Sequence, residues 1–225
     1  MTNVHLAAQP VARLGLRERK KQRTRHTIIE VATKLFAERG YTETTLAQIA
    51  DAAEIAPSTF FNYFPSKVDI VFALVGAITE SARERIVVRP EGERAADAIV
   101  SWIKNDLAEV EQPYTEALRL IPRIIESDPE LRAEDRLRLA LLEDVFAEAF
   151  ASERGEEPDG MHARVLAVIA LRAIIDVWNA WYRQHSADAT FDLGELLVLK
   201  ADYVEQALEA GHAAVALLPA PPDDL

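Results

Sequence analysis

The sequence predicts an all-α fold with about nine helices. Alanine and leucine are abundant, while only 8 of the 225 residues are glycine. Apolar residues recur three and four positions apart instead of alternating, which is the spacing of one helix face. Apolar residues make up 49% of the chain, enough to bury a large core at this length.

The first helix is predicted over 16–39, because apolar residues keep one stripe along it and Gly40 supplies a C-terminal stop. The stripe consists of Ile28, Val31, Ala32, Leu35 and Phe36. A short second helix is predicted to begin at Leu46 and end near Ala53. Thr45 and Gln48 stand three apart just at its start, in the pattern of a capping box.

A third short helix is predicted to begin at Pro57, since proline costs no hydrogen bond at the first helical position. Pro65 ends it, and Ser66 with Asp69 predicts the cap of a fourth helix that continues to Pro90. Only Glu54-Ile55-Ala56 separate the second and third helices. Two short helices joined in this way predict a helix-turn-helix motif at about 44–63.

The chain beyond Pro90 reads as long amphipathic helices, interrupted by glycine, proline and polar runs. They are predicted at about 93–111, 114–127, 130–153, 161–185 and 193–217. The helix at 161–185 is apolar around most of its circumference, so we expect it to be buried or to pair with a partner subunit. Residues 1–15 and 219–225 are predicted to be a disordered arm and tail.

Charge is distributed unevenly. The whole chain carries a net charge of −12, yet residues 1–67 hold 10 Lys and Arg against 6 Asp and Glu. Within 13–25, seven basic residues accompany a single acidic one. A basic end on an acidic body favours polyanion binding at that end, although a solvated tail would have the same composition.

Several classes of protein are not favoured. There is no cysteine for a disulfide or a thiol nucleophile, and the five histidines are scattered, so we expect no metal, no cofactor and no enzymatic activity. The start lacks the pattern of a secretory signal. The longest charge-free run, 210–222, has 13 residues with three prolines, so we expect no membrane span and a cytoplasmic protein.

The stretch IAPSTFFNYFPSK (55–67) concentrates aromatic residues in the third helix. Phe60 and Phe64 lie four apart and are expected to face the core with Ile55. Ser58, Phe61 and Asn62 then point outward, where hydroxyl, amide and ring suit base edges and thymine methyls in a major groove. The alternative is that all four rings are core.

Residues 17–72, centred on LFAERGYTETTLAQIADAAEIAPSTFFNYFPSKVDIV, resemble the N-terminal domain of the TetR family of bacterial transcriptional regulators. The resemblance implies a DNA-binding domain at 16–66, joined by the fourth helix to a ligand-binding and dimerisation domain at 67–218. It also implies three sets of DNA contacts. These are phosphate contacts by Thr45, Thr59, Tyr63 and Lys67, base contacts by Pro57, Ser58, Phe61 and Asn62, and support from Lys20, Arg23 and Arg25. Thr44 is a further DNA-binding residue in this set.

Three residues depart from the family pattern. Glu54 stands where glycine is frequent, so a residue with a side chain is expected at positive φ, at a cost of about 1–2 kcal/mol. Ala56 replaces a serine cap, a loss of about 1 kcal/mol. Phe61 stands where many relatives have tyrosine, which removes a phosphate hydrogen bond and offers an apolar base contact instead.

The resemblance further implies a repressor that binds a palindromic double-stranded DNA operator as a homodimer, through helices at about 161–185 and 193–217. A small hydrophobic effector would release it, and the FFNYFPSK variant resembles a subgroup that senses acyl-CoA-like molecules. Candidate ligand-binding residues are Trp102, Tyr114, Phe146, Phe150, Arg172, Asp176, Trp178 and Asn179. Arg172 and Asp176 could equally pair across the dimer seam, and a ligand-blind architectural DNA-binding protein is the alternative function.

Overall fold

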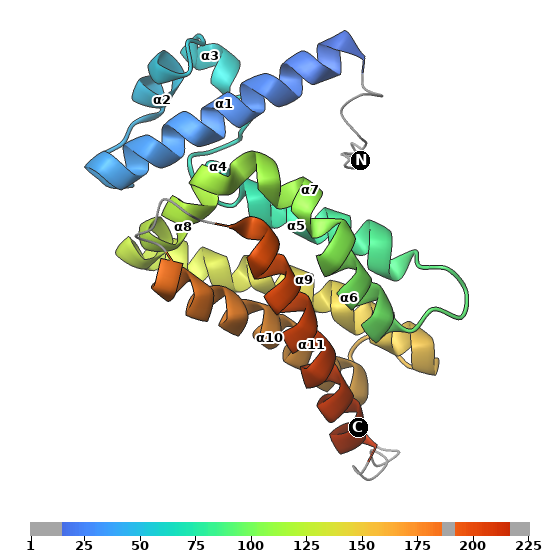
Figure 1. Ribbon diagram of the computed structural model, residues 1–225. Helices are drawn as coiled ribbons and strands as arrows, with labels where there is room; N and C mark the ends of the chain where they lie inside the picture. Colours follow the sequence, from blue (N-terminus) through green and yellow to red (C-terminus); the bar gives the residue numbers. More distant parts are fainter. Residues whose placement is uncertain (1–14, 186–191, 217–225) are drawn as a thin grey trace. The chain divides into compact units, whose positions relative to one another are not determined.

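The computed structural model describes residues 15–185 and 192–216, and this part of the chain contains helices and no strand (Figure 1). The all-α prediction is confirmed. The α-helices are α1 (Leu16–Arg39), α2 (Leu46–Ala52), α3 (Pro57–Phe60), α4 (Val68–Val71), α5 (Ala73–Ala82), α6 (Ala95–Asn105), α7 (Leu107–Glu111), α8 (Thr115–Ser127), α9 (Pro129–Arg154), α10 (Met161–His185) and α11 (Leu193–Val215). A π-helix, η2 (Arg83–Val87), follows α5, and a 3₁₀ turn, η3 (Gln112–Tyr114), precedes α8. The predicted arm and tail lie outside the described residues, apart from Gly15.

Helix ends were predicted well where the chain carries strong stop signals. α1 and α10 have the predicted bounds, and Gly40 at φ 92° ends α1. Two long helices are broken instead: the fourth divides into α4, α5 and η2, and the fifth divides at Asp106. The third helix is a single turn that ends at Phe60 rather than near Pro65.

The predicted cap by Ser66 is wrong. Its hydroxyl donates to Asp69 Oδ2 at 2.7 Å, so it is paired with a carboxylate and not with the backbone. α4 begins after Lys67, without a side-chain cap. Asp69 also accepts from Arg138 Nη2 at 3.2 Å, which ties α4 to the first part of α9.

The described residues form two compact units. The first comprises the chain up to Ile78 together with Val110–Arg138, and the second comprises Thr79–Glu109 together with the chain from Leu139 onward. α5 and α9 therefore each contribute to both units. This division follows packing alone, and the functional boundary near residue 66 stays a prediction.

The first unit is built on α1. Figure 1 shows α2 and α3 along one side of this helix, and α1 also contacts α4, η3 and α8. Of its apolar stripe, Ile28, Ala32 and Phe36 are buried, whereas Val31 and Leu35 are partly buried against the same core. Phe60, Phe64 and Phe72 complete a single core with residues from α2, α8 and α9.

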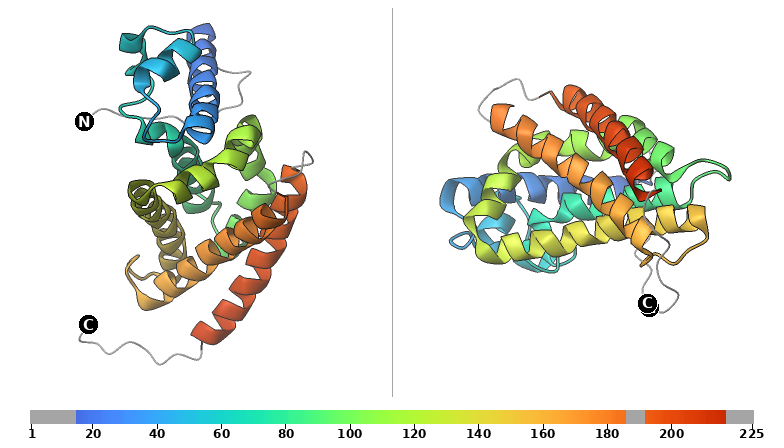
Figure 2. Two further views of the ribbon diagram at one scale, coloured as in Figure 1. Left: turned by 90° about the vertical axis from the view of Figure 1, so that its left-hand side faces the viewer. Right: turned by 90° about the horizontal axis from the view of Figure 1, so that it is seen from below.

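The second unit contains α10 and α11, which lie side by side, and α6, which packs against α11 (Figure 2). Gly211 permits the close approach of α10 and α11, because a Cβ there would lie 2.8 Å from Ile169 Cδ1. Trp102 of α6 is fully buried and donates from Nε1 to Ser81 Oγ at 3.1 Å.

Within the described residues, α10 alone is long and apolar enough to cross a membrane by length and composition. Core helices of soluble proteins meet the same criterion. Here α10 packs along α11, and it carries the ion pair of Arg172 and Asp176 near its middle.

Candidate nucleic-acid interface

The recognition element of the helix-turn-helix is α3 with the turn that follows it. Phe60 and Phe64 are 0% and 1% exposed, as predicted for core residues. Phe61 is 58% exposed, and its ring meets that of Phe60 edge-on at 5.6 Å between centroids. Pro57, Ser58 and Asn62 are also exposed, so polar and apolar groups are presented together on one short surface.

The turn before α3 has the predicted unusual backbone. Glu54 has φ 54°, and within the described residues it is the one non-glycine residue at positive φ. Its N–H donates to Asp51 O at 3.0 Å, and the N–H of Ile55 donates to Ala50 O at 2.9 Å. Ala56 caps α3 without a side-chain hydrogen bond, as expected.

The two threonines before α2 have different surroundings. Thr45 is exposed and forms the predicted capping box: Gln48 N donates to its Oγ1 at 3.3 Å, and its own N–H donates to Gln48 Oε1 at 2.9 Å. Thr44 is 1% exposed, and its hydroxyl donates to Gly40 O at 2.8 Å and to Leu35 O at 3.3 Å. The Thr44 side chain therefore lies inside the protein, whereas that of Thr45 is exposed to solvent.

The predicted basic contacts also divide into inward and outward groups. Lys20 and Arg23 on α1 are exposed. Arg25 is half-buried: its Nη1 donates to Tyr63 O at 3.1 Å, and its guanidinium lies 4.3 Å from the centre of the Phe64 ring. Burial lowers the pKa of Arg25, opposed by the nearby Tyr114 and Asp69. Arg25 thus holds the end of the recognition element from within.

Lys67 turns toward the loop that connects α1 to α2, where its ammonium contacts backbone carbonyls and the Tyr41 ring. Burial raises the pKa of Tyr41 to about 12, assisted by Asp128, Glu130 and Asp69. Thr59 and Tyr63, the remaining predicted phosphate contacts, are half-buried at the edge of α3.

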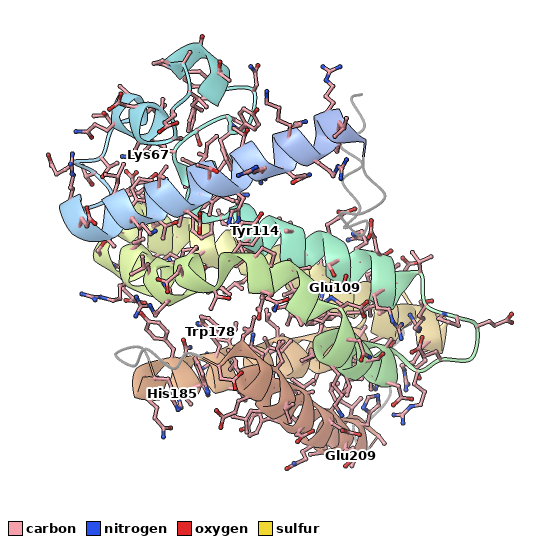
Figure 3. All side chains as sticks on the ribbon, turned by 45° about the horizontal axis from the view of Figure 1, so that its top comes forward. Lys67, Glu109, Tyr114, Trp178, His185 and Glu209 are labelled. Carbon is pink, nitrogen blue, oxygen red and sulfur yellow. The ribbon has the colours of Figure 1, made fainter. Side chains whose placement is uncertain are left out.

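The predicted ligand-binding residues belong to both units. Trp102, Phe146 and Phe150 are buried in the second unit, where Trp102 and Phe146 meet with ring centroids 6.2 Å apart. Tyr114 belongs to the first unit, where its ring lies 5.1 Å from that of His26. Figure 3 labels Tyr114 before α8 and Trp178 on α10.

The polar candidates on α10 are exposed. Arg172 Nη2 pairs with Asp176 Oδ1 at 2.6 Å, and the Arg172 side chain is 67% exposed. Asn179 is exposed on the same helix. Arg172 and Asn179 are therefore exposed and Asp176 is partly exposed, with its side chain 44% accessible.

Sequence reasoning missed two structural contacts of charged residues. Lys200 of α11 is 2% exposed, and its ammonium lies 5.0 Å from the centre of the Trp178 ring. Its spacing of three and four positions from the buried Leu196, Leu197 and Val204 was the available signal. Asp128 caps α9 and accepts from Thr42 Oγ1 at 3.4 Å, a contact 86 positions apart that no local pattern reveals.

Comparisons with known proteins match both halves of the chain. Residues 28–74 match the family of bacterial regulatory proteins of the tetR type, and residues 93–209 match the MftR C-terminal domain. The HTH-type transcriptional regulator TcmR of Streptomyces glaucescens is 33% identical over 180 residues, which cover 77% of this chain and 80% of TcmR.

A putative mycofactocin biosynthesis transcriptional regulator, MftR of Mycobacterium tuberculosis (strain ATCC 25618 / H37Rv), is 29% identical over 78% of this chain and 88% of its own length. Among solved structures, a putative TetR-family regulator from Mesorhizobium loti superposes with a TM-score of 0.55 at 18% identity, covering 85% of this chain and 98% of that one. The likeness to the Mesorhizobium loti structure supports the fold. With the exposed recognition element and the match to TcmR, these findings show that the chain belongs to the TetR family of DNA-binding transcriptional regulators.

Proposed function

We propose that this regulator is a repressor that binds a palindromic operator as a homodimer and leaves it when a small hydrophobic effector binds. The observation that carries the proposal is that α3 and the turn after it have a buried side and an exposed side. Phe60 and Phe64 anchor the element in the core, while Ser58, Phe61 and Asn62 remain exposed. A helix held in this way can enter a major groove and meet base edges with its outer side.

The operator can be found by selecting binding sequences from random DNA with the full chain. We expect a palindrome whose half-sites are centred about one helical turn apart, because a two-fold dimer presents two recognition elements to successive major grooves. Asn62→Ala is expected to relax the preference at one base position in each half-site. An unchanged sequence preference in this variant would count against base readout by Asn62.

Phe61 is proposed to read a thymine methyl group, since more than half of its surface is available and it has no hydroxyl for phosphate. Replacing thymine by uracil in the selected operator removes only that methyl. Burying one such group contributes about 0.8 kcal/mol, so wild-type affinity should fall about fourfold at the contacted position. The Phe61→Ala variant should not distinguish the two DNAs, and equal discrimination by both proteins would refute the contact.

Dimerisation is proposed through α10 and α11. Val168, Val198, Leu199 and Tyr203 are 45–57% exposed on these helices, an unusual number of apolar side chains for a solvent-facing surface. Leu199→Glu should convert the dimer to monomer in sedimentation velocity. Leu137→Glu is the matched control, because Leu137 is exposed to 66% on α9, outside the proposed interface. Dissociation by the control alone would place the interface elsewhere.

The effector is proposed to be hydrophobic, and an acyl-CoA-like compound is the first candidate. Thermal-shift screening should compare long-chain acyl-CoAs, free fatty acids and planar cationic drugs. Binding to the folded state raises the melting temperature in proportion to the logarithm of ligand concentration over Kd. The absence of any shift with every long-chain acyl compound would refute this effector class.

A ligand-blind architectural DNA-binding protein would share the same DNA-binding half. The two functions differ in one measurement, the change of operator affinity on addition of a ligand that gives a thermal shift. A coupling of about 1–3 kcal/mol would weaken operator binding roughly 5- to 150-fold. Unchanged affinity with saturating ligand would favour the architectural function.

A further inference from the structure

The first part of α9 contacts the helix-turn-helix region at two places. Arg138 Nη2 donates to Asp69 Oδ1 of α4 at 3.2 Å, shortly after the recognition element. Asp128, the residue before α9, accepts from Thr42 Oγ1 at 3.4 Å, in the loop that leads into α2. All four residues belong to the first unit, so both contacts are internal to it. α9 is thus attached to the two chain segments that flank the motif.

Asp69 is the centre of the stronger of these contacts. Its Oδ2 accepts from Ser66 Oγ at 2.7 Å, while Arg138 Nε donates to Glu134 Oε1 at 2.6 Å. The Arg138 guanidinium also lies 5.7 Å from the centre of the buried Phe72 ring. The side chains of Asp69 and Arg138 are 27% and 28% exposed, so solvent screens their attraction less than it screens a surface pair. Arg138 is therefore held by two carboxylates and a ring.

Arg138 lies where α9 passes from one unit to the other. The boundary between the units falls after Arg138, yet α9 is one helix over Pro129–Arg154 (Figure 1). After its first residue it contains neither proline nor glycine, the residues at which helices commonly kink. Phe146, fully buried in the second unit, follows Arg138 by eight residues, or about 12 Å of helix. A displacement of the helix at Phe146 is therefore carried along it to Arg138.

Phe146 is also one of the residues predicted to bind the effector. Its ring meets that of Trp102 at 6.2 Å between centroids, and the buried Phe150 follows one turn later on α9. An effector that binds among these rings favours the position of α9 that accommodates it best. At the other end of the route, Asp69 holds Ser66, close behind the recognition element. One helix thus connects the candidate effector residues to the segment that follows the recognition element.

We propose that α9 transmits effector binding to the helix-turn-helix, through the contact between Arg138 and Asp69. This inference rests on the proposed function, because it names the route by which the effector weakens operator binding. Arg138 is a positioning residue that contacts neither DNA nor effector. The contact of Asp128 with Thr42 is the lesser one, since a hydroxyl bond of 3.4 Å is weaker than a charge-assisted bond.

Operator DNA serves as the probe, because the coupling between two sites is reciprocal. If effector binding acts on the motif through α9, operator binding acts on the second part of α9 by the same route. Operator that fixes Asp69 also fixes Arg138, so hydrogen exchange of the amides over 145–151 should slow when saturating selected operator is added to the full chain. A coupling of ordinary size predicts slowing by about fivefold or more.

Two variants break the contact from opposite sides. Arg138→Gln removes the positive charge and keeps a long polar side chain, while Asp69→Asn keeps an acceptor for Ser66. Both should bind operator within about fivefold of the wild-type affinity, because partly exposed ion pairs contribute little to an equilibrium constant. In both, the slowing over 145–151 at saturating operator should fall below about twofold. The double variant should respond as either single variant does, since both changes break one contact.

Arg136→Gln is the matched control. Arg136 is exposed and lies two positions before Arg138 on the same helix, so this variant should keep the full response to operator. A merely structural role for Arg138 would alter exchange in the free protein and leave the response to operator unchanged. A full response in Arg138→Gln, or no response in operator-bound wild type, would overturn the coupling and leave the proposed operator binding intact. If the full chain bound no DNA, the proposed function would fail and this inference with it.

Discussion

Replacing Glu54 by glycine should stabilise this protein. Glu54 has φ 54° in the turn of the helix-turn-helix, where an L-residue with a Cβ costs about 1–2 kcal/mol. Glycine has no Cβ, but it makes the unfolded chain more flexible, which offsets about 0.4–1 kcal/mol. At the middle of these two ranges, the net gain in free energy of unfolding is about 0.8 kcal/mol. The side chain is exposed, so its removal sacrifices little packing.

Urea unfolding followed by circular dichroism measures the gain. With a denaturant slope of about 2 kcal/mol per molar, the midpoint of Glu54→Gly should rise by about 0.25–0.5 M. Glu54→Ala is the control, since it removes the carboxylate and retains the Cβ. If Glu54→Ala were stabilised as much as Glu54→Gly, the effect would come from charge, and the argument from backbone strain would be refuted.

Three further predictions follow from single contacts. Thr45→Ala removes the bond from Gln48 N to Thr45 Oγ1 and should lower the free energy of unfolding by about 1 kcal/mol in the same urea assay. Ser81→Ala leaves the buried Trp102 Nε1–H without its acceptor and should cost about 1–3 kcal/mol, with a matching shift in the tryptophan-fluorescence midpoint. The pKa of Tyr41 is raised to about 12, so the native state keeps a proton that the unfolded chain releases above its ordinary pKa of 10.0. Stability should therefore fall between pH 10 and 12, and Tyr41→Phe should flatten that fall in alkaline unfolding curves.

Local signals in the sequence predicted much of the fold. Gly40, Pro57 and the pair of Thr45 and Gln48 act within one turn of a helix, so their effects can be read without knowing the tertiary structure. The positive φ at Glu54 was expected from the family resemblance, because glycine is frequent at this position among its members. The core face of α3 followed from the spacing of Phe60 and Phe64.

Side-chain partners distant in sequence were not predictable. Arg25 bonds to Tyr63 O across 38 positions, and Lys67 bonds to Tyr41 O across 26. Both residues are basic and lie in or beside the helix-turn-helix, and the sequence indicates their charge but not the direction of their side chains. Ser66 likewise carries the pattern of a cap. Its hydroxyl instead donates to the Asp69 carboxylate, which also pairs with Arg138.

The direction of these cations changes how an acidic protein of this kind would hold DNA. If Arg25 and Lys67 stabilise the motif from within, neutralisation of phosphate falls to exposed residues near the start of α1, such as Lys20 and Arg23. Two contacts in each half-site would give a dimer a salt slope of about 3.6, against about 7.2 if all four cations contacted phosphate. A measured wild-type slope near the lower value would mean that the motif depends more on its fixed shape and base contacts than on charge. This follows from the contacts of two half-buried side chains, although the number of basic residues in the sequence is the same in both cases.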